Sequence, residues 1–90
     1  MKYTVEYSAK AKENIKKLKK TGNDSIKKKL YDLHNELKEH PKTGTGKPEF
    51  LKYRNCWSRR INKEHRLCYE IEDDKVIVLV LSAYGHYEEN

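Results

Sequence analysis

The stretch that decides the fold runs from Trp57 to Tyr69 and reads WSRRINKEHRLCY. Its two halves alternate in side-chain character on either side of the polar residues 62–65. A period of two is typical of β-strands, and a short polar connection between two such runs predicts an antiparallel hairpin. We therefore expect strands over residues 57–62 and 65–71.

The segments on either side of this hairpin also predict strands, over residues 50–53 and 75–82. The run from Val76 to Leu81 is apolar at every position, as expected for a central strand that is covered on both faces. Because the connections are short and polar, the four strands should form an antiparallel meander.

The first half of the chain predicts one strand and two helices. Residues 2–7 alternate, and Ser8 is placed to cap a helix whose apolar stripe ends before Gly22. A second helical stripe ends at Pro41, and the short connection predicts an antiparallel helical hairpin. The expected fold is α+β in the order β-α-α-β-β-β-β, with both helices on one face of a twisted antiparallel sheet, in a single domain over residues 1–90.

The composition limits the classes of partner. The 90 residues carry 20 Lys and Arg against 14 Asp and Glu, a net charge of +6, which favours nucleic acid, an anionic membrane or an acidic protein as partner. A basic composition without any nucleic-acid role is the alternative. The first residues lack the apolar run of a signal peptide, and no apolar run is long enough to span a bilayer, so we expect a cytoplasmic protein without membrane contact. The two cysteines, Cys56 and Cys68, are expected to be reduced thiols.

Arginines on the predicted hairpin are the candidate phosphate ligands. If Ile61 and Leu67 face the helices, Arg60 and Arg66 share the open face of the sheet. Two neighbouring guanidinium groups repel each other unless an anion bridges them, and arginine matches the geometry of phosphate. Arg59 is a further phosphate-binding candidate. Alternatively, each arginine pairs with a carboxylate, for which the candidates are Glu49, Glu64 and Glu70.

Three more residues have side chains suited to proton transfer near a phosphate. His86 and Tyr87 follow the central strand, where a histidine can protonate a leaving oxygen and a tyrosine can orient it or stack on a base, unless both are an ordinary polar strand end. Glu49 is the best-placed candidate base. Its parity matches that of Leu51, so we expect it to reach the open face only from irregular backbone. No metal or cofactor is expected, because no zinc-ligand spacing to His86 is found at His34, His40 or His65.

These residues suit the cleavage of RNA by its own 2′-hydroxyl. Glu49 would remove the proton of the 2′-hydroxyl, and His86 would protonate the departing 5′-oxygen. Arg66, with help from Arg60 and Lys52, would stabilise the charge that builds on the phosphorus. DNA lacks the 2′-hydroxyl, so this reaction is specific for RNA.

Three segments of the chain resemble the YoeB/Txe toxins of the RelE/ParE superfamily. They are residues 46–52, which read GKPEFLK, the stretch from Trp57 to Tyr69, and the pair His86 and Tyr87. The resemblance implies two helices packed on a twisted antiparallel sheet. It also implies a ribosome-dependent mRNA endonuclease that cuts mRNA in the A site of the 70S ribosome, contacts ribosomal RNA, forms a homodimer and is neutralised by a YefM-type antitoxin.

By position in these motifs, the resemblance assigns a role to each candidate residue. Glu49 corresponds to the general base, Arg66 to the arginine that stabilises the phosphate, and His86 to the general acid. Tyr87 corresponds to a tyrosine that helps to position the substrate. The auxiliary basic positions correspond to Lys52 and Arg60.

The sequence allows two roles for the lysines of the predicted helices and two alternative functions for the chain. The lysines are either a solvated surface or a salt-sensitive docking surface for ribosomal RNA; they are Lys10, Lys12, Lys16, Lys17, Lys19, Lys20, Lys27, Lys28 and Lys29. The first rival function is a non-enzymatic toxin of the same superfamily that poisons DNA gyrase. The second is a basic ribosome- or RNA-binding module without catalysis.

Overall fold

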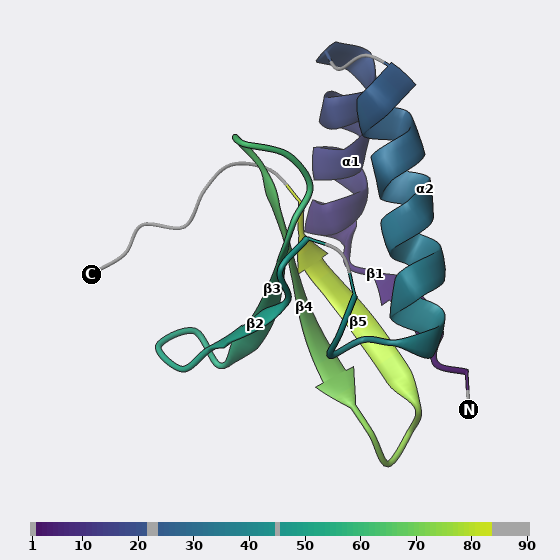
Figure 1. The fold of residues 1–90 in the computed structure, drawn as a ribbon, viewed down its shortest axis with the longest axis vertical. Helices are drawn as coiled ribbons and strands as arrows, with labels where there is room; N and C mark the ends of the chain where they lie inside the picture. Colours follow the sequence, from purple (N-terminus) through teal and green to yellow (C-terminus); the bar gives the residue numbers. More distant parts are fainter. Residues whose placement is uncertain (1, 22–23, 45, 84–90) are drawn as a thin grey trace.

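The structure is a computed structural model that describes residues 2–21, 24–44 and 46–83 (Figure 1). The predicted order of elements is confirmed. The elements are β1 (Thr4–Tyr7), α1 (Ala9–Thr21), α2 (Asp24–Glu39), β2 (Glu49–Leu51), β3 (Cys56–Arg60), β4 (Arg66–Glu72) and β5 (Ile77–Ser82). His86 and Tyr87 lie outside the described residues.

The five strands form one sheet in the order β1-β5-β4-β3-β2. Strands β2 to β5 are the predicted antiparallel meander. Strand β5 is an interior strand with β1 and β4 on its two sides, and β4 holds the middle position. One edge departs from the antiparallel expectation, because β1 pairs with β5 in parallel, from Thr4 opposite Ile77 to Tyr7 opposite Val80. Strand β1 is therefore an edge strand of the sheet, next to β5.

The helix boundaries follow the capping and breaking residues of the sequence. Ser8 Oγ accepts a hydrogen bond from the backbone nitrogen of Ala11 at 3.0 Å, which confirms the predicted cap of α1. The same hydroxyl donates to the backbone oxygen of Leu81 at 2.9 Å and so ties the start of α1 to β5. Helix α2 ends two residues before Pro41, as predicted.

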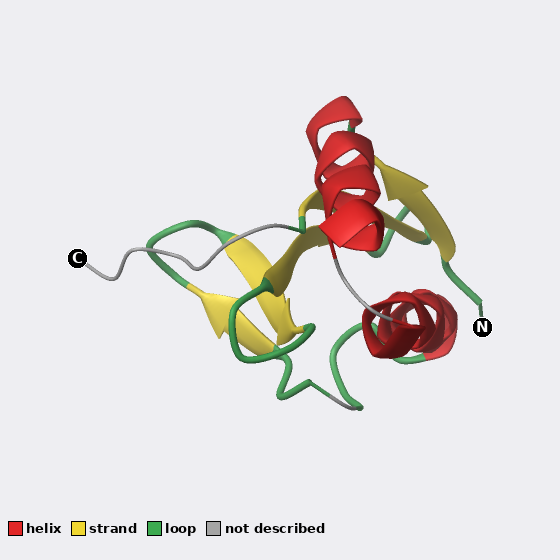
Figure 2. Cartoon of the chain, turned by 90° about the horizontal axis from the view of Figure 1, so that it is seen from above, coloured by secondary structure: helices red, strands yellow, loops and turns green. Residues whose placement is uncertain are grey.

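The two helices pack beside each other and against the sheet (Figure 2). Their apolar stripes and the facing side chains of the sheet form one core. Its buried members are Ala11, Leu18, Leu30, Leu33, Leu37, Ile61, Leu67, Tyr69, Val78, Val80 and Ala83. Neither of the two helices, as far as the chain is described, combines the length and apolar character needed to cross a bilayer.

A second and smaller apolar cluster lies on the opposite face of the sheet. It consists of Leu51, Cys56 and Cys68, with Leu81 packed against it. Only a few apolar side chains are buried there, so the rest of this face is left for polar and charged side chains.

Candidate active site

The face of the sheet that points away from the helices brings Glu49, Ser58, Arg60 and Arg66 together. Glu49 lies opposite Ser58 in the β2–β3 pair, and Arg60 lies opposite Arg66 in the β3–β4 pair. Residues directly opposite each other in an antiparallel pair share a face. The predicted placement of Arg60 and Arg66 on one face is therefore confirmed.

Arg66 is held between a buried hydroxyl and an exposed carboxylate. Its Nε donates to Ser58 Oγ at 2.7 Å, and its Nη2 donates to Glu49 Oε1 at 3.2 Å. Ser58 is fully buried, whereas the side chain of Glu49 is 59% exposed. The alternative prediction that an arginine pairs with a carboxylate is thus confirmed for Arg66.

Glu49 reaches this face from regular backbone, which corrects the expectation of an irregular one. It is the first residue of β2 and shares its face with Leu51, which is buried with Cys56 and Cys68 rather than under the helices. Phe50 points to the helix side, where it is 45% exposed. Glu49 and Leu51 do share a face, as their parity predicts, but Leu51 belongs to the small apolar cluster and not to the core under the helices.

Arg60 and Lys52 add positive charge around this pair. Arg60 is exposed, and its backbone nitrogen donates to the backbone oxygen of Gly46 at 2.7 Å. Gly46 has a φ of 81°, and a Cβ there would lie 2.6 Å from the backbone oxygen of Arg60, so the loop before β2 needs glycine to approach β3. Lys52 is exposed in the turn that follows β2.

Arg59 has a different role from the one predicted. It lies on the helix side of β3 and is fully buried. Its guanidinium donates to Glu36 Oε1 at 3.2 Å and to the backbone oxygens of His40 and Thr43 at 2.9 and 2.8 Å. These contacts tie the end of α2 and the following loop to β3, so we assign Arg59 a structural role in place of the predicted phosphate contact.

The sequence did not reveal that Ser58 anchors Arg66. The available signal was that Ser58 shares its parity with Arg60, which places a hydroxyl on the same face as the arginines. Ser58 also lies in one cross-strand row with Glu49, Cys68 and Ser82. Strand β5 ends at Ser82, so the chain leaves the sheet directly after this row.

Beside this row, the two thiols are in direct contact. Cys56 Sγ and Cys68 Sγ lie 2.9 Å apart, and both cysteines are free and buried. Burial, followed by the hydrogen bond with Cys68, raises the pKa of Cys56 to about 12. Both cysteines are free rather than joined in a disulfide, as predicted, although the sequence gave no sign of their contact.

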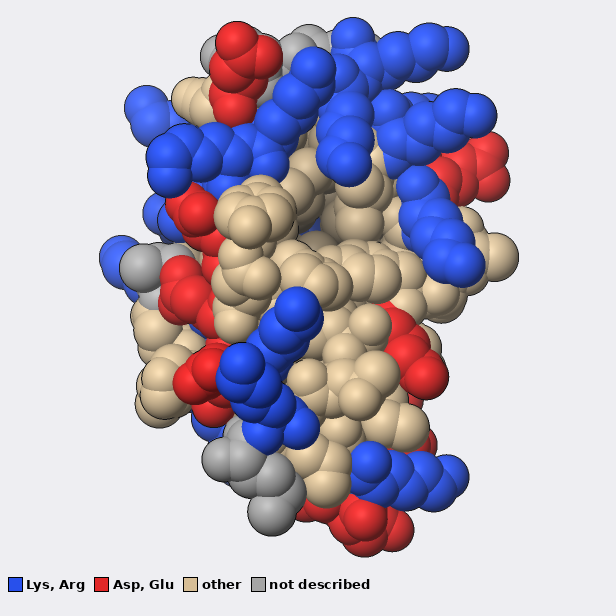
Figure 3. All heavy atoms as spheres, turned by 90° about the vertical axis from the view of Figure 1, so that its right-hand side faces the viewer, with Lys and Arg blue, Asp and Glu red and all other residues tan. Residues whose placement is uncertain are grey.

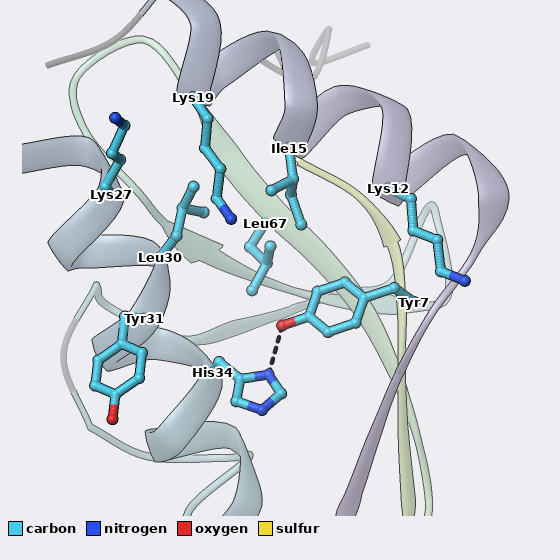
Figure 4. A pocket seen from close by; sticks show the side chains of 9 residues that line it. All are labelled: Tyr7, Lys12, Ile15, Lys19, Lys27, Leu30, Tyr31, His34 and Leu67. Atoms are coloured by element: carbon cyan, nitrogen blue, oxygen red, sulfur yellow. Dashed lines mark hydrogen bonds between the residues drawn. The ribbon is translucent and has the colours of Figure 1, made fainter. Parts of the chain in front are cut away.

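A second surface feature, which the sequence did not predict, is a groove of about 370 Å³ between the two helices (Figure 4). Figure 3 shows this side of the molecule, where uncharged surface lies in the middle and lysine and arginine side chains crowd the upper part. The lining combines apolar side chains with lysines. It consists of Tyr7, Lys12, Ile15, Lys19, Lys27, Leu30, Tyr31, His34 and Leu67.

Tyr7 and His34 form a polar pair within this groove. The Tyr7 hydroxyl and His34 Nδ1 lie 2.7 Å apart in a hydrogen bond, and the two rings stack with centroids 5.7 Å apart (Figure 4). Burial, helped by the charge of Lys38, lowers the pKa of His34, and burial raises the pKa of Tyr7. Both groups are therefore uncharged at neutral pH.

Comparison with known proteins identifies the family. Residues 7–87 match the sequence model of the YoeB-like toxin of bacterial type II toxin–antitoxin systems. The chain belongs to this family of toxins. Toxin YoeB of Escherichia coli K12 is 44% identical over 64 residues, which cover 69% of this chain and 74% of that protein.

Solved structures of YoeB proteins agree in fold. A YoeB/ParE toxin from Agrobacterium tumefaciens superimposes with a TM-score of 0.83 at 29% identity, over 93% of this chain and 99% of that one. Staphylococcus aureus YoeB matches in its complex with YefM, with a TM-score of 0.76 and 32% identity, and as a dimer, with a TM-score of 0.80 and 31% identity. Each match covers 97% of this chain and 100% of the other.

Proposed function

We propose that this YoeB-family toxin is a ribosome-dependent mRNA endoribonuclease. It cuts mRNA in the ribosomal A site by attack of a 2′-hydroxyl on the adjacent phosphate and thereby inhibits translation. The observation that carries the proposal is the arrangement of Arg66, held by Ser58 and directed at Glu49 on an exposed sheet face. This places a candidate base and a candidate phosphate ligand within reach of one bound nucleotide.

In this mechanism Glu49 removes the proton of the 2′-hydroxyl. Its side chain is more than half exposed, so an RNA strand on this face has direct access to it. A positioned base of this kind contributes roughly 10²–10⁴-fold to the rate. The hydrogen bond between Glu49 and Arg66 joins the group that takes the proton to the group that receives the phosphate charge.

Arg66 stabilises the negative charge that builds on the phosphate during attack. Its Nε is already committed to Ser58, so its orientation is set before RNA arrives, and preorganised donors of this kind lower the barrier without later rearrangement. Arg60, directly opposite on β3, and Lys52 in the next turn supply further positive charge.

His86 and Tyr87 complete the proposal from their position in the family motif. His86 protonates the departing 5′-oxygen, and Tyr87 positions the substrate. Both residues lie outside the described part of the chain, and the His86→Gln variant below tests the role of the acid.

The decisive test is primer extension on a defined mRNA in a reconstituted translation reaction. We expect new 5′ ends at A-site codons that require ribosomes and that are lost with Glu49→Gln or His86→Gln. The matched control is Glu13→Gln, an exposed carboxylate on α1 that should leave cleavage unchanged. Arrest of translation without cuts would favour the binding module, and no effect on translation would favour gyrase as the target.

We also propose that a YefM-type antitoxin neutralises the chain by laying an apolar segment with acidic flanks into the groove between α1 and α2. The support is the apolar lining under Lys12, Lys19 and Lys27, together with the YefM complex of the Staphylococcus aureus relative. Charge reversal by Lys19→Glu should weaken antitoxin binding and its salt dependence, whereas Lys10→Glu, which lies outside the lining, should not. Equal affinity for both variants would contradict this docking site.

Finally, we propose that the chain forms a homodimer, as Staphylococcus aureus YoeB does in one of its structures. Sedimentation equilibrium over a range of concentrations should return twice the 10.7 kDa mass of the chain. A monomeric mass at every concentration would contradict the proposal.

A further inference from the structure

The two thiols lie close enough together to react with each other. Cys56 and Cys68 are 2% and 4% exposed, and their sulfur atoms lie 2.9 Å apart across β3 and β4. Cys68 lies opposite Ser58, so Cys56, two residues earlier in β3, is its diagonal neighbour. The chain has no other cysteine, so each thiol has one intramolecular partner.

A covalent bond between these sulfur atoms needs a small movement. A disulfide has a sulfur–sulfur distance of about 2.0 Å, compared with 2.9 Å here. The register of β4 against β5 shifts between Cys68 and Tyr69. The ladder is thus locally interrupted beside Cys68, at the kind of position where strands bend.

We propose that Cys56 and Cys68 are an oxidative modification site, a dithiol that peroxide closes to a disulfide, and that this closure is transmitted through Ser58 to Arg66. Neither part rests on the proposed ribonuclease activity. In cytosolic proteins, disulfides of this kind are mostly transient and regulatory.

The reaction takes place in two balanced steps. One thiolate attacks a peroxide oxygen, the O–O bond breaks, and a sulfenic acid forms as hydroxide leaves. The second sulfur attacks the sulfenic sulfur, the S–O bond breaks, and a second hydroxide leaves as the disulfide forms. With the two thiol protons the hydroxides become water, so the dithiol is oxidised by two electrons and one hydrogen peroxide is reduced to water.

Access to Cys56 is possible for a small oxidant. Cys56 borders a surface hollow of about 280 Å³ that Phe50, Asn55 and Glu70 also line. Burial raises the pKa of Cys56 and so lowers the fraction present as thiolate. The charge of Glu70 lowers this fraction further, whereas the charge of Arg54 raises it. The oxidation should therefore be slow at neutral pH and faster as the pH rises.

The path from the disulfide to Arg66 is one residue long. Ser58 lies opposite Cys68 and is fully buried, and its hydroxyl is the acceptor for Arg66 Nε. Drawing the two sulfur atoms together moves β3 against β4 at this position and changes the distance from the hydroxyl to Arg66. Because the chain is packed tightly here, a shift of a few tenths of an ångström alters this bond.

The test uses the purified protein, hydrogen peroxide and three readouts, which are mass analysis, NMR and gel electrophoresis without reductant. Intact-mass analysis should show a loss of about 2 Da for the two thiol hydrogens, with no free thiol left for iodoacetamide in the unfolded chain and full recovery of both thiols after dithiothreitol. Nitrogen-15 NMR should show the Arg66 Nε–H resonance moving on oxidation and returning on reduction. Cys68→Ala should show neither change and should gain oxygen at Cys56 instead.

Three results would overturn the inference. Both thiols could remain open to alkylation after prolonged exposure to peroxide at raised pH, where the thiolate of Cys56 is more populated. The disulfide could form between two molecules, which gel electrophoresis without reductant would reveal. An intramolecular disulfide with an unmoved Arg66 resonance would refute the link between the two sites. All three readouts are independent of RNA cleavage, so a failure here is distinguishable from a failure of the proposed function.

Discussion

Arg66 donates from Nε to Oγ of Ser58 at 2.7 Å, and this bond joins a partly buried arginine to a fully buried hydroxyl. Both residues lie on paired strands, which hold side chains more precisely than loops do. Its Nη2 donates to Glu49, whose carboxylate ends the row at the edge of the sheet.

Replacing Glu49 by glutamine should remove catalysis while leaving the fold intact. Glutamine keeps the size of the side chain but cannot accept the 2′-hydroxyl proton, so the single-turnover cleavage rate should fall roughly 10²–10⁴-fold. Because Glu49 is exposed, the free energy of unfolding should change by less than about 0.5 kcal/mol. Cleavage at the wild-type rate by a folded Glu49→Gln protein would rule out this base.

Replacing Ser58 by alanine should act on Arg66 rather than on the substrate directly. A hydrogen bond to a charged group contributes about 1.5–3 kcal/mol, which corresponds to a loss of roughly 10–100-fold in kcat if Arg66 is misaligned. The loss should fall on kcat with little change in KM, and the double variant with Arg66→Met should lose no more than Arg66→Met alone. Additive losses in this double-mutant cycle would show that Ser58 does not act through Arg66.

Replacing Arg59 by methionine should destabilise the protein. The change removes the Arg59 guanidinium from its contacts with the Glu36 carboxylate and with the backbone oxygens of His40 and Thr43. Breaking a buried ion pair costs about 3–5 kcal/mol, and the lower end applies here because the side chain of Glu36 is 26% exposed. Urea denaturation provides the measurement, with the exposed neighbour variant Arg60→Met as the control; equal stability of the two variants would contradict the structural role.

His34 should make the stability of the fold depend on pH. Burial lowers its pKa in the folded chain below the ordinary value of 6.5, so the unfolded chain binds a proton first as the pH falls. The contribution of His34 is therefore present above pH 6.5 and is lost as the pH falls towards the folded pKa. Unfolding free energies at pH 7.5 and pH 5 should differ more in the wild type than in His34→Gln, and an identical difference in both proteins would refute this role.

The sequence was sufficient for the elements and their order, because alternation, helical stripes and capping residues act locally. It was not sufficient for the side of the sheet on which a residue is buried. Leu51 has the parity of a core residue, but the core it joins is the small one under Glu49. The burial of Arg59 depends on the loop after α2 returning over β3, and no local pattern shows this return.

The contact of the cysteines could not be predicted for a related reason. Cys56 and Cys68 meet because β3 and β4 pair in the register that sets Ser58 opposite Cys68. A different register would have separated the two thiols and the bond from Ser58 to Arg66 as well. Alternation defines the faces of a strand, whereas the register follows from packing over the whole sheet.

On the proposed mechanism, the face formed by Glu49, Ser58 and Arg66 cuts RNA through the RNA's own 2′-hydroxyl. The most direct test is the single-turnover cleavage of ribosome-bound mRNA that carries one 2′-deoxynucleotide immediately before the scissile phosphate in the A-site codon. We predict that the wild-type protein cuts the unmodified mRNA at this position and leaves a 2′,3′-cyclic phosphate, while the 2′-deoxy mRNA stays intact there. Cleavage of both messages at the same position and at equal rates would contradict the mechanism.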